Sequence, residues 1–277
     1  MSWPSMKLWE SNVIRAFVLL MLILTAYSSC LKAGFNSLDD QFSIVHNERL
    51  KDVSHLGKIF SASFFNDTHY YRPMVEASFW LEYRAFKLNP FFYHLDNLLL
   101  HAFNAFLVFI LIFMILRDNR AAFLTALLFA VHPIQSEAVV NIAGRSILLS
   151  CFFGLISFIS FLYLRRRRFK LFFYLVSIFS FLCSLLSKES AAMLPILFIS
   201  YAWFIDRKRG ESPLISFLSV VPYLTVLILF IYFRKKLGIT DLYHWGSWME
   251  LGLGFTSFLR GVLTGLRLYI YPVGLYF

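Results

Sequence analysis

Long stretches without a charged residue divide this sequence, and they constrain its fold more than any other feature. Seven of them are about 16 to 22 residues long, and an eighth is interrupted only by Arg260 and Arg267. A helix of about 20 apolar residues crosses roughly 30 Å of hydrocarbon, because it rises about 1.5 Å per residue. We therefore predict eight membrane spans in one transmembrane domain over residues 1–277. The spans are expected at 13–31, 95–116, 121–136, 146–164, 171–187, 190–205, 212–233 and 253–275.

The composition agrees with a chain embedded in a membrane. Hydrophobic residues make up 59% of the sequence and charged residues 15%, whereas an average soluble domain is about 45–50% apolar and about 25% charged. These values exclude disordered, collagen-like, coiled-coil and disulfide-stapled secreted chains. The three cysteines lie inside apolar runs, which favours small core residues over disulfides or metal ligands. The predicted fold class is an all-α integral membrane protein, a multi-pass helical bundle.

Basic clusters indicate the orientation of the spans. With a cytoplasmic N-terminus, the clusters at 117–120, 165–170 and 207–209 all lie in the cytoplasm, as the positive-inside rule requires. The four-arginine run at 165–168 is then a topological flank, and no nucleic-acid partner is expected. The basic group at 234–236 is an exception, because it would lie outside. The first span could also be a secretory signal peptide, but its poor cleavage sequence favours a retained anchor.

One long segment, 32–93, forms the first extracytoplasmic loop in this topology. Apolar residues recur at helical spacing near 50–60 and 79–86, which predicts amphipathic helices on the membrane surface. The loop also contains two adjacent acidic residues, Asp39 and Asp40. Such a pair suits general-base catalysis or metal binding, because repulsion makes one carboxylate a better proton acceptor. An acidic pair in a loop is nevertheless more often a solvated turn or a helix cap.

The second span carries a polar stripe. His94, Asn97, His101 and Asn104 are spaced three, four and three residues apart, so they share one face of a helix. Polar side chains avoid lipid, and the stripe is therefore predicted to face the protein interior or a wet cavity. Hydrogen bonding between helices and contact with a ligand both fit this pattern.

Two short outer turns hold further charged residues. His132, Glu137 and Arg145 lie between the third and fourth spans, and Lys188 and Glu189 between the fifth and sixth. The spacing of His132 and Glu137 does not match a zinc motif, and no third ligand is near. Glu137 and Arg145 could form an ion pair that places a cation where a lipid headgroup arrives. Because all these residues are predicted on the side that also holds the acidic pair and Arg72, we interpret them as one candidate site.

Several motifs in order give the chain a family resemblance. They are residues 71–74 (YRPM), 88–101 (LNPFFYHLDNLLLH) with Asn104, 132–139 (HPIQSEAV) with Gly144 and Arg145, 187–190 (SKES), and 272–275 (PVGL). Their sequence and spacing resemble the transmembrane and tetratricopeptide-repeat O-mannosyltransferases and their bacterial relatives. The resemblance covers about residues 30–277.

The resemblance implies a GT-C fold, in which the first outer loop carries the catalytic acid. It implies transfer of a sugar, mannose in the animal members, from a polyprenyl or dolichyl phosphate to an acceptor hydroxyl of a protein or glycan, with inversion. The active face would be extracytoplasmic, either the lumen of the endoplasmic reticulum or the cell exterior. No cofactor is required by the sequence, and the need for a divalent metal is open.

The resemblance also assigns roles to residues. Asp39 or Asp40 would deprotonate the acceptor, with Asp39 favoured. Arg145, Lys188 and Arg72 would stabilise the departing phosphate, Glu137 and Glu189 would orient these cations, and His132 would donate a hydrogen bond to phosphate. His94, Asn97 and His101 would support the site. The alternatives are a transporter or flippase for polyprenyl-linked molecules and a non-catalytic binding relative.

The chain departs from the family pattern at its C-terminal end. The family continues past its eighth helix into further helices and usually a string of helical repeats, which are absent from this sequence. We therefore expect a fragment, a truncated product, or a minimal homologue that needs a partner subunit or the missing C-terminal region.

Overall fold

The described parts of the protein are helical. The structure, a computed structural model, describes residues 6–35, 38–51, 56–61, 70–164, 170–208, 210 and 212–239. Every regular element within these ranges is an α-, 3₁₀- or π-helix. The predicted all-α fold class is therefore confirmed, while the expected span at 253–275 lies outside the described residues.

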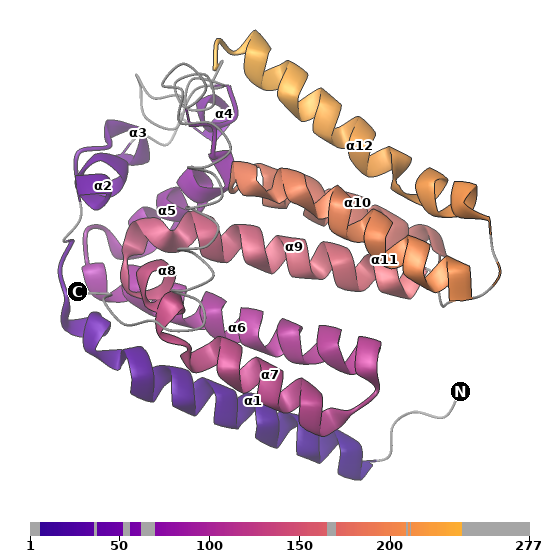
Figure 1. Cartoon of the computed structure of the whole chain (residues 1–277). Helices are drawn as coiled ribbons and strands as arrows, with labels where there is room; N and C mark the ends of the chain where they lie inside the picture. The colour runs from indigo at the N-terminus through magenta and orange to yellow at the C-terminus, as the bar shows by residue number, and fades with distance from the viewer. Residues whose placement is uncertain are drawn as a thin grey trace, which may run out of the picture.

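Long helices run side by side in a bundle (Figure 1). They are α1 (Met6–Tyr27), α6 (Pro90–Leu116), α7 (Asn119–Val131), α9 (Arg145–Leu164), α10 (Lys170–Leu185), α11 (Leu194–Lys208) and α12 (Pro213–Lys236). The helix α12 lies at the edge of the bundle and is inclined to the others (Figure 1). Each of the first seven predicted spans overlaps one of these helices, and the number of membrane crossings stays a prediction.

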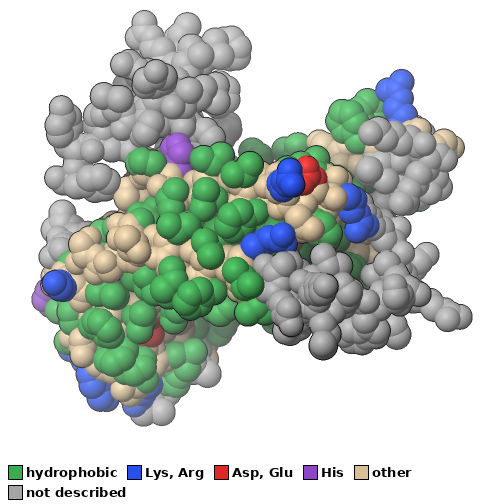
Figure 2. All heavy atoms as spheres, turned by 90° about the horizontal axis from the view of Figure 1, so that it is seen from below, with side chains coloured by type: hydrophobic (Ala, Val, Ile, Leu, Met, Phe, Trp, Pro, Cys, Tyr) green, Lys and Arg blue, Asp and Glu red, His purple; other side chains and the backbone are tan. Residues whose placement is uncertain are grey.

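Four helical segments are long and apolar enough to cross a membrane: Val13–Lys32, Pro90–Leu116, Ile142–Leu164 and Phe217–Lys236. A fifth candidate is a pair, Asn119–Val131 with Pro133–Val140, bent by 52°. The predicted fifth and sixth spans form shorter apolar helices, Leu171–Leu185 and Glu189–Phe204. Hydrophobic side chains cover much of the described surface seen from below in Figure 2, and many exposed side chains of α1 and α7 are apolar, as lipid contact requires.

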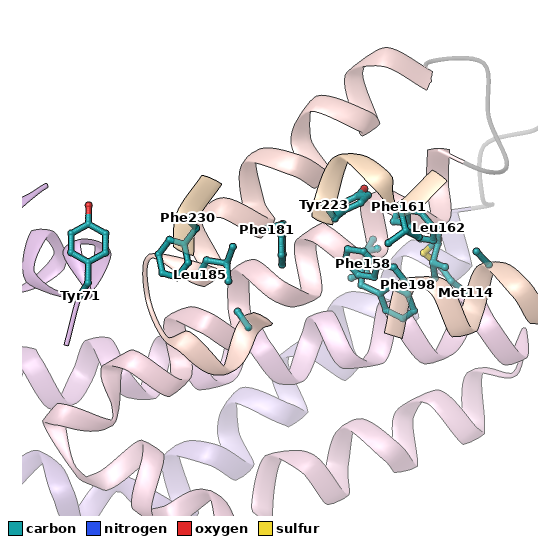
Figure 3. Packing of buried hydrophobic residues seen from close by; sticks show 14 of the residues in the cluster. Tyr71, Met114, Phe158, Phe161, Leu162, Phe181, Leu185, Phe198, Tyr223 and Phe230 are labelled. Carbon is teal, nitrogen blue, oxygen red and sulfur yellow. The ribbon is translucent and has the colours of Figure 1, made fainter. Parts of the chain in front are cut away.

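Aromatic packing and serine hydrogen bonds join the upper helices of the bundle. Figure 3 shows Phe158 and Phe161 of α9 beside Phe198 of α11 and Tyr223 of α12, and the Phe161 and Phe198 rings stack at 5.1 Å. The Tyr223 hydroxyl lies 2.7 Å from the Ser177 hydroxyl of α10. Hydrogen bonds between helices matter here, because an unsatisfied hydroxyl is costly in an apolar interior.

The loop after α1 folds over one end of the bundle. It contains α2 (Leu38–Asp40), α3 (Glu48–Lys51), α4 (Leu56–Ile59) and α5 (Pro73–Phe86). The buried side of α5, with Val75 and Phe79, packs with Ile44, Tyr93 and Ile142 in one apolar cluster. A helix is therefore present where 79–86 predicted one, but its apolar face packs on the end of the bundle, whereas the sequence placed it on a membrane surface.

Candidate functional site

The charged segments singled out in the sequence meet at one end of the bundle (Figure 1). They lie in α2, just before α5, in the short helix α8 (Ser136–Val140), at the start of α9, and in the turn between α10 and the 3₁₀-helix η6 (Glu189–Met193). The chain reverses at this end after α1, α7 and α10, which explains why residues distant in sequence come together. The shared location predicted from the alternation of spans is thus reproduced.

A pocket of about 150 Å³ lies among these segments. Its lining residues are Asp39, Ser43, Tyr70, Arg72, Val75, Phe79, Ala143 and Ser146. Asp39 and Arg72, which are 33 positions apart, therefore face one hollow from two parts of the loop. A carboxylate and a guanidinium in one pocket provide a proton acceptor and an anion-binding group.

The two adjacent acidic residues have different environments. Asp39 is exposed, and its carboxylate accepts no hydrogen bond within the described part of the chain. Asp40 is 2% exposed and accepts a hydrogen bond from the Ala143 backbone N–H at 3.0 Å. Asp40 thereby connects α2 to the 3₁₀-helix η5 (Ile142–Gly144), while Asp39 is accessible from the pocket.

Arg72 links the loop to the turn after α10. Its Nε and Nη2 atoms donate to one oxygen, Oε2 of Glu189, at 3.3 and 3.1 Å. The guanidinium also lies over the Tyr70 ring, 4.4 Å from its centroid. Nearby, the Met74 N–H donates to the Leu186 carbonyl at 3.2 Å, which ties the start of α5 to the end of α10.

Lys188 stands beside this pair, and its ammonium group makes no hydrogen bond or ion pair within the described ranges. Burial lowers the pKa of its ammonium group, and the positive charge of Arg72 lowers it further. Glu189 and Glu137 act in the opposite direction, so both carboxylates are close enough to influence the Lys188 charge. The turn therefore holds two neighbouring cations that repel each other.

Arg145 occupies a buried charge cluster next to the pocket, and its side chain is fully buried. It forms two hydrogen bonds with the Glu82 carboxylate, each 3.0 Å long, and an ion pair with Asp96 at 2.7 Å. It also donates to the Asn97 side chain and to the Tyr93 carbonyl. All three guanidinium nitrogens are thus engaged, and Arg145 connects α5, α6 and α9 as an internal clamp.

The predicted ion pair between Glu137 and Arg145 was wrong. Glu137 is exposed on α8, whereas Arg145 is directed inward to Glu82 and Asp96. An arginine that is completely removed from water needs a buried or nearly buried counter-charge, which the exposed Glu137 does not offer.

Sequence reasoning missed Glu82 and Asp96. Glu82 follows Phe79 by three positions, so a carboxylate lies on the apolar face of α5. The position of Glu82 on that apolar face was the sequence signal that could have identified it as a buried carboxylate. Burial raises the pKa of Glu82 to about 7, against the opposing effect of Arg145.

The polar stripe of α6 lies inside the bundle. Asn97 donates to the Asn141 carbonyl at 2.9 Å, and Asn104 donates to the Leu148 carbonyl at 3.0 Å. The ring of His101 is 3.0 Å from the Ala130 carbonyl, and that of His94 is 3.4 Å from the Gly34 carbonyl. None of these side chains lines the pocket, and their contacts join α6 to neighbouring segments.

His132 ends α7 and shapes the bend that follows. Its Nδ1 accepts a hydrogen bond from the Ile134 N–H at 3.2 Å, and its carbonyl oxygen lies 3.3 Å from the Tyr27 hydroxyl. It does not line the pocket. Across the described residues, no group of three His, Cys, Asp or Glu side chains could hold a metal ion.

These features define a class: a helical membrane protein with an acid and two cations gathered at one end of its bundle. No family model matches the chain, and no solved structure matches it. The chain is 34% identical over 200 residues to protein O-mannosyl-transferase F38B6.6 of Caenorhabditis elegans, covering 69% of this chain and 28% of the relative.

Two mammalian proteins give similar matches. Identity to the human protein O-mannosyl-transferase TMTC1 is 34%, over 68% of this chain and 24% of that protein. Identity to the mouse protein O-mannosyl-transferase TMTC3 is 33%, over 56% of this chain and 17% of that protein. The chain belongs to the family of these protein O-mannosyl-transferases, and it spans less than a third of the length of each of these three relatives.

Proposed function

We propose that this protein is a membrane glycosyltransferase of the GT-C type. It would transfer mannose from a polyprenyl or dolichyl phosphate carrier to an acceptor hydroxyl, with inversion at the anomeric carbon. The observation that carries the proposal is the pocket, in which Asp39 and Arg72 are both wall residues. The names of the relatives support mannose as the sugar and a protein as the acceptor.

Asp39 is the proposed general base. A base must reach the proton that it removes, and Asp39 is exposed at the pocket with an unoccupied carboxylate. The acceptor oxygen attacks C1 of the sugar as its proton passes to Asp39. The bond from C1 to the phosphate oxygen breaks, and its electron pair stays on that oxygen.

Arg72 and Lys188 are the proposed phosphate-binding cations. The donor is a phosphodiester with one negative charge, and the departing polyprenyl phosphate gains a second one. Two neighbouring cations oppose this developing charge, the kind of electrostatic stabilisation that often contributes most to an enzymatic rate. Arg145 would act indirectly, because its contacts with Glu82 and Asp96 hold α5, and α5 begins next to Arg72.

The proposed orientation places this end of the bundle on the extracytoplasmic face. The basic residues at 117–120 and 207–208 belong to the opposite end, where the positive-inside rule expects the cytoplasm. The donor would then reach the site from the outer leaflet, and the acceptor would be a lumenal or external protein.

The test is a transfer assay on the purified 277-residue chain in lipid nanodiscs. We expect the wild-type chain to move labelled mannose from mannosyl phosphoryl polyprenol to acceptor peptides. Asp39→Asn should abolish mannose transfer and preserve binding of the phosphate lipid, because the Asn side chain has the shape of Asp but cannot accept a proton. If the wild-type chain binds the lipid and transfers no sugar, the proposal fails and a transporter or binding role is favoured.

A further inference from the structure

We propose that Glu189 is a counter-ion that holds Arg72 until the donor phosphate replaces it, and thereby sets the affinity of the site for the donor. This inference rests on the proposed function, because it concerns Arg72, which lines the same pocket. It gives Glu189 a positioning role that differs from simple support of Arg72 in the bound state.

The pairing of Arg72 with Glu189 is incomplete. Both arginine nitrogens donate to Oε2, whereas the stronger fork geometry uses both carboxylate oxygens. The second oxygen, Oε1, is buried and has no hydrogen-bond partner among the described residues. A buried acceptor without a donor is destabilising, because it has lost water and gained no partner. The pair is therefore less stable than a fully bonded one, as expected for a contact that must open.

The hydrogen-bonding capacity of the two cations leaves room for an anion. Glu189 bonds Arg72 directly and Glu137 acts on Lys188 through its charge, but the Lys188 ammonium makes no hydrogen bond or ion pair among the described residues. A phosphodiester arriving between Arg72 and Lys188 supplies an acceptor for that ammonium. It also offers two free oxygens, enough to bind both cations at once.

The surrounding contacts allow this exchange without a movement of helices. The hydrogen bond from Met74 to Leu186 fixes the backbone next to Arg72. The Tyr70 ring supports the guanidinium from one side. Arg72 already lines the pocket that contains Asp39. Rotation of the Arg72 side chain is therefore enough to break its contact with Glu189 and to bind a ligand in the pocket.

The alternative is that Glu189 orients Arg72 toward the bound phosphate. The two roles predict opposite effects for Glu189→Gln, a substitution that preserves shape and removes the charge. A competing counter-ion weakens donor binding, so its removal should strengthen binding. An orienting carboxylate strengthens binding, so its removal should weaken it.

The experiment measures binding of sugar-free polyprenyl monophosphate to the full chain in nanodiscs of neutral lipid. We expect Glu189→Gln to lower the dissociation constant by about tenfold, the effect of freeing one charged hydrogen-bond donor. The double variant with Arg72→Gln should lose this gain. Glu48→Gln is the matched control, because Glu48 is an exposed carboxylate of the loop that carries Arg72 and forms an ion pair with Lys51, away from the turn after α10.

Each outcome decides the question. Tighter binding by Glu189→Gln that depends on Arg72 supports the exchange. Unchanged or weaker binding, with the wild-type chain still binding the lipid, overturns it and leaves the proposed function intact. If neither chain binds polyprenyl phosphate, both this inference and the proposed function fail. Should Glu189→Gln lower the melting temperature, Glu189→Asp provides the same test by withdrawing the carboxylate by one methylene.

Discussion

Replacing Arg145 tests whether this residue is an internal clamp. In Arg145→Met the volume is nearly preserved while the cation is removed. Glu82, which is 8% exposed, would then be left without its bidentate partner. Removing one member of a buried ion pair costs about 3–5 kcal/mol. Asp96 should contribute less to the loss, because 42% of its side chain is exposed and water can solvate it again.

The assay is thermal unfolding of the purified chain in detergent. For a chain of this size, about 1 kcal/mol corresponds to a shift of roughly 2–4 °C, so we expect a fall of about 6–20 °C. The defect should be smaller at pH 6 than at pH 8, because a proton on Glu82 removes the unpaired charge. Arg120→Met, an exposed arginine at the start of α7, is the control and should shift the melting temperature by less than about 2 °C.

One result would refute the clamp. If Arg145→Met unfolds at the wild-type temperature and loses only its affinity for polyprenyl phosphate, Arg145 binds the donor directly. Equal effects of Arg145→Met and Arg120→Met on stability would contradict the buried ion pair itself.

Three further predictions concern stability. Burial raises the pKa of Glu76 to about 7, so the folded state binds a proton more tightly than the unfolded state does. This proton-linked contribution to stability is complete below about pH 4.5 and is lost as the pH rises through 7. Glu76→Gln should therefore flatten the dependence of the melting temperature on pH over that range. Gly144→Ala should destabilise the chain by about 1–3 kcal/mol, because the new Cβ would lie 2.3 Å from the Ala138 carbonyl oxygen, and an unchanged melting temperature would show that this contact is absent. Ser177→Ala should destabilise the fold by about 1 kcal/mol, because it removes the hydrogen bond to the Ser157 carbonyl. Thermal unfolding measures this loss. The control is Ser200→Ala, because the exposed Ser200 hydroxyl donates to the Ile196 carbonyl of its own helix.

The sequence predicted the bundle well because hydrophobic length is a local property. Each uncharged stretch between 13 and 233 overlaps a helix, although the stretch at 121–136 bends after Val131. The acidic pair in α2 lies at the same end of the bundle as the turn that holds Lys188 (Figure 1). The stripe of His94, Asn97 and His101 was also correctly directed away from lipid, because polar spacing along one helix fixes a face.

The partners of the charged residues could not be predicted in the same way. Which carboxylate meets Arg145 depends on how α5 folds back over α6 and α9, a tertiary contact between Glu82 and Arg145 that spans 63 positions. The different environments of Asp39 and Asp40 depend on the η5 backbone, whose N–H groups carry no side-chain signal. Sequence patterns therefore located the site, and the packing of the loop determined which of its residues are accessible.

The central claim is that exposed Asp39 removes the proton while buried Asp40 holds the loop in place. The most direct test compares Asp39→Asn with Asp40→Asn for two quantities, the rate of mannose transfer and the melting temperature. We predict that Asp39→Asn lowers the rate by about 10²–10⁴-fold at an unchanged melting temperature, whereas Asp40→Asn lowers the melting temperature because it weakens the bond to Ala143. Wild-type transfer by Asp39→Asn would contradict the account.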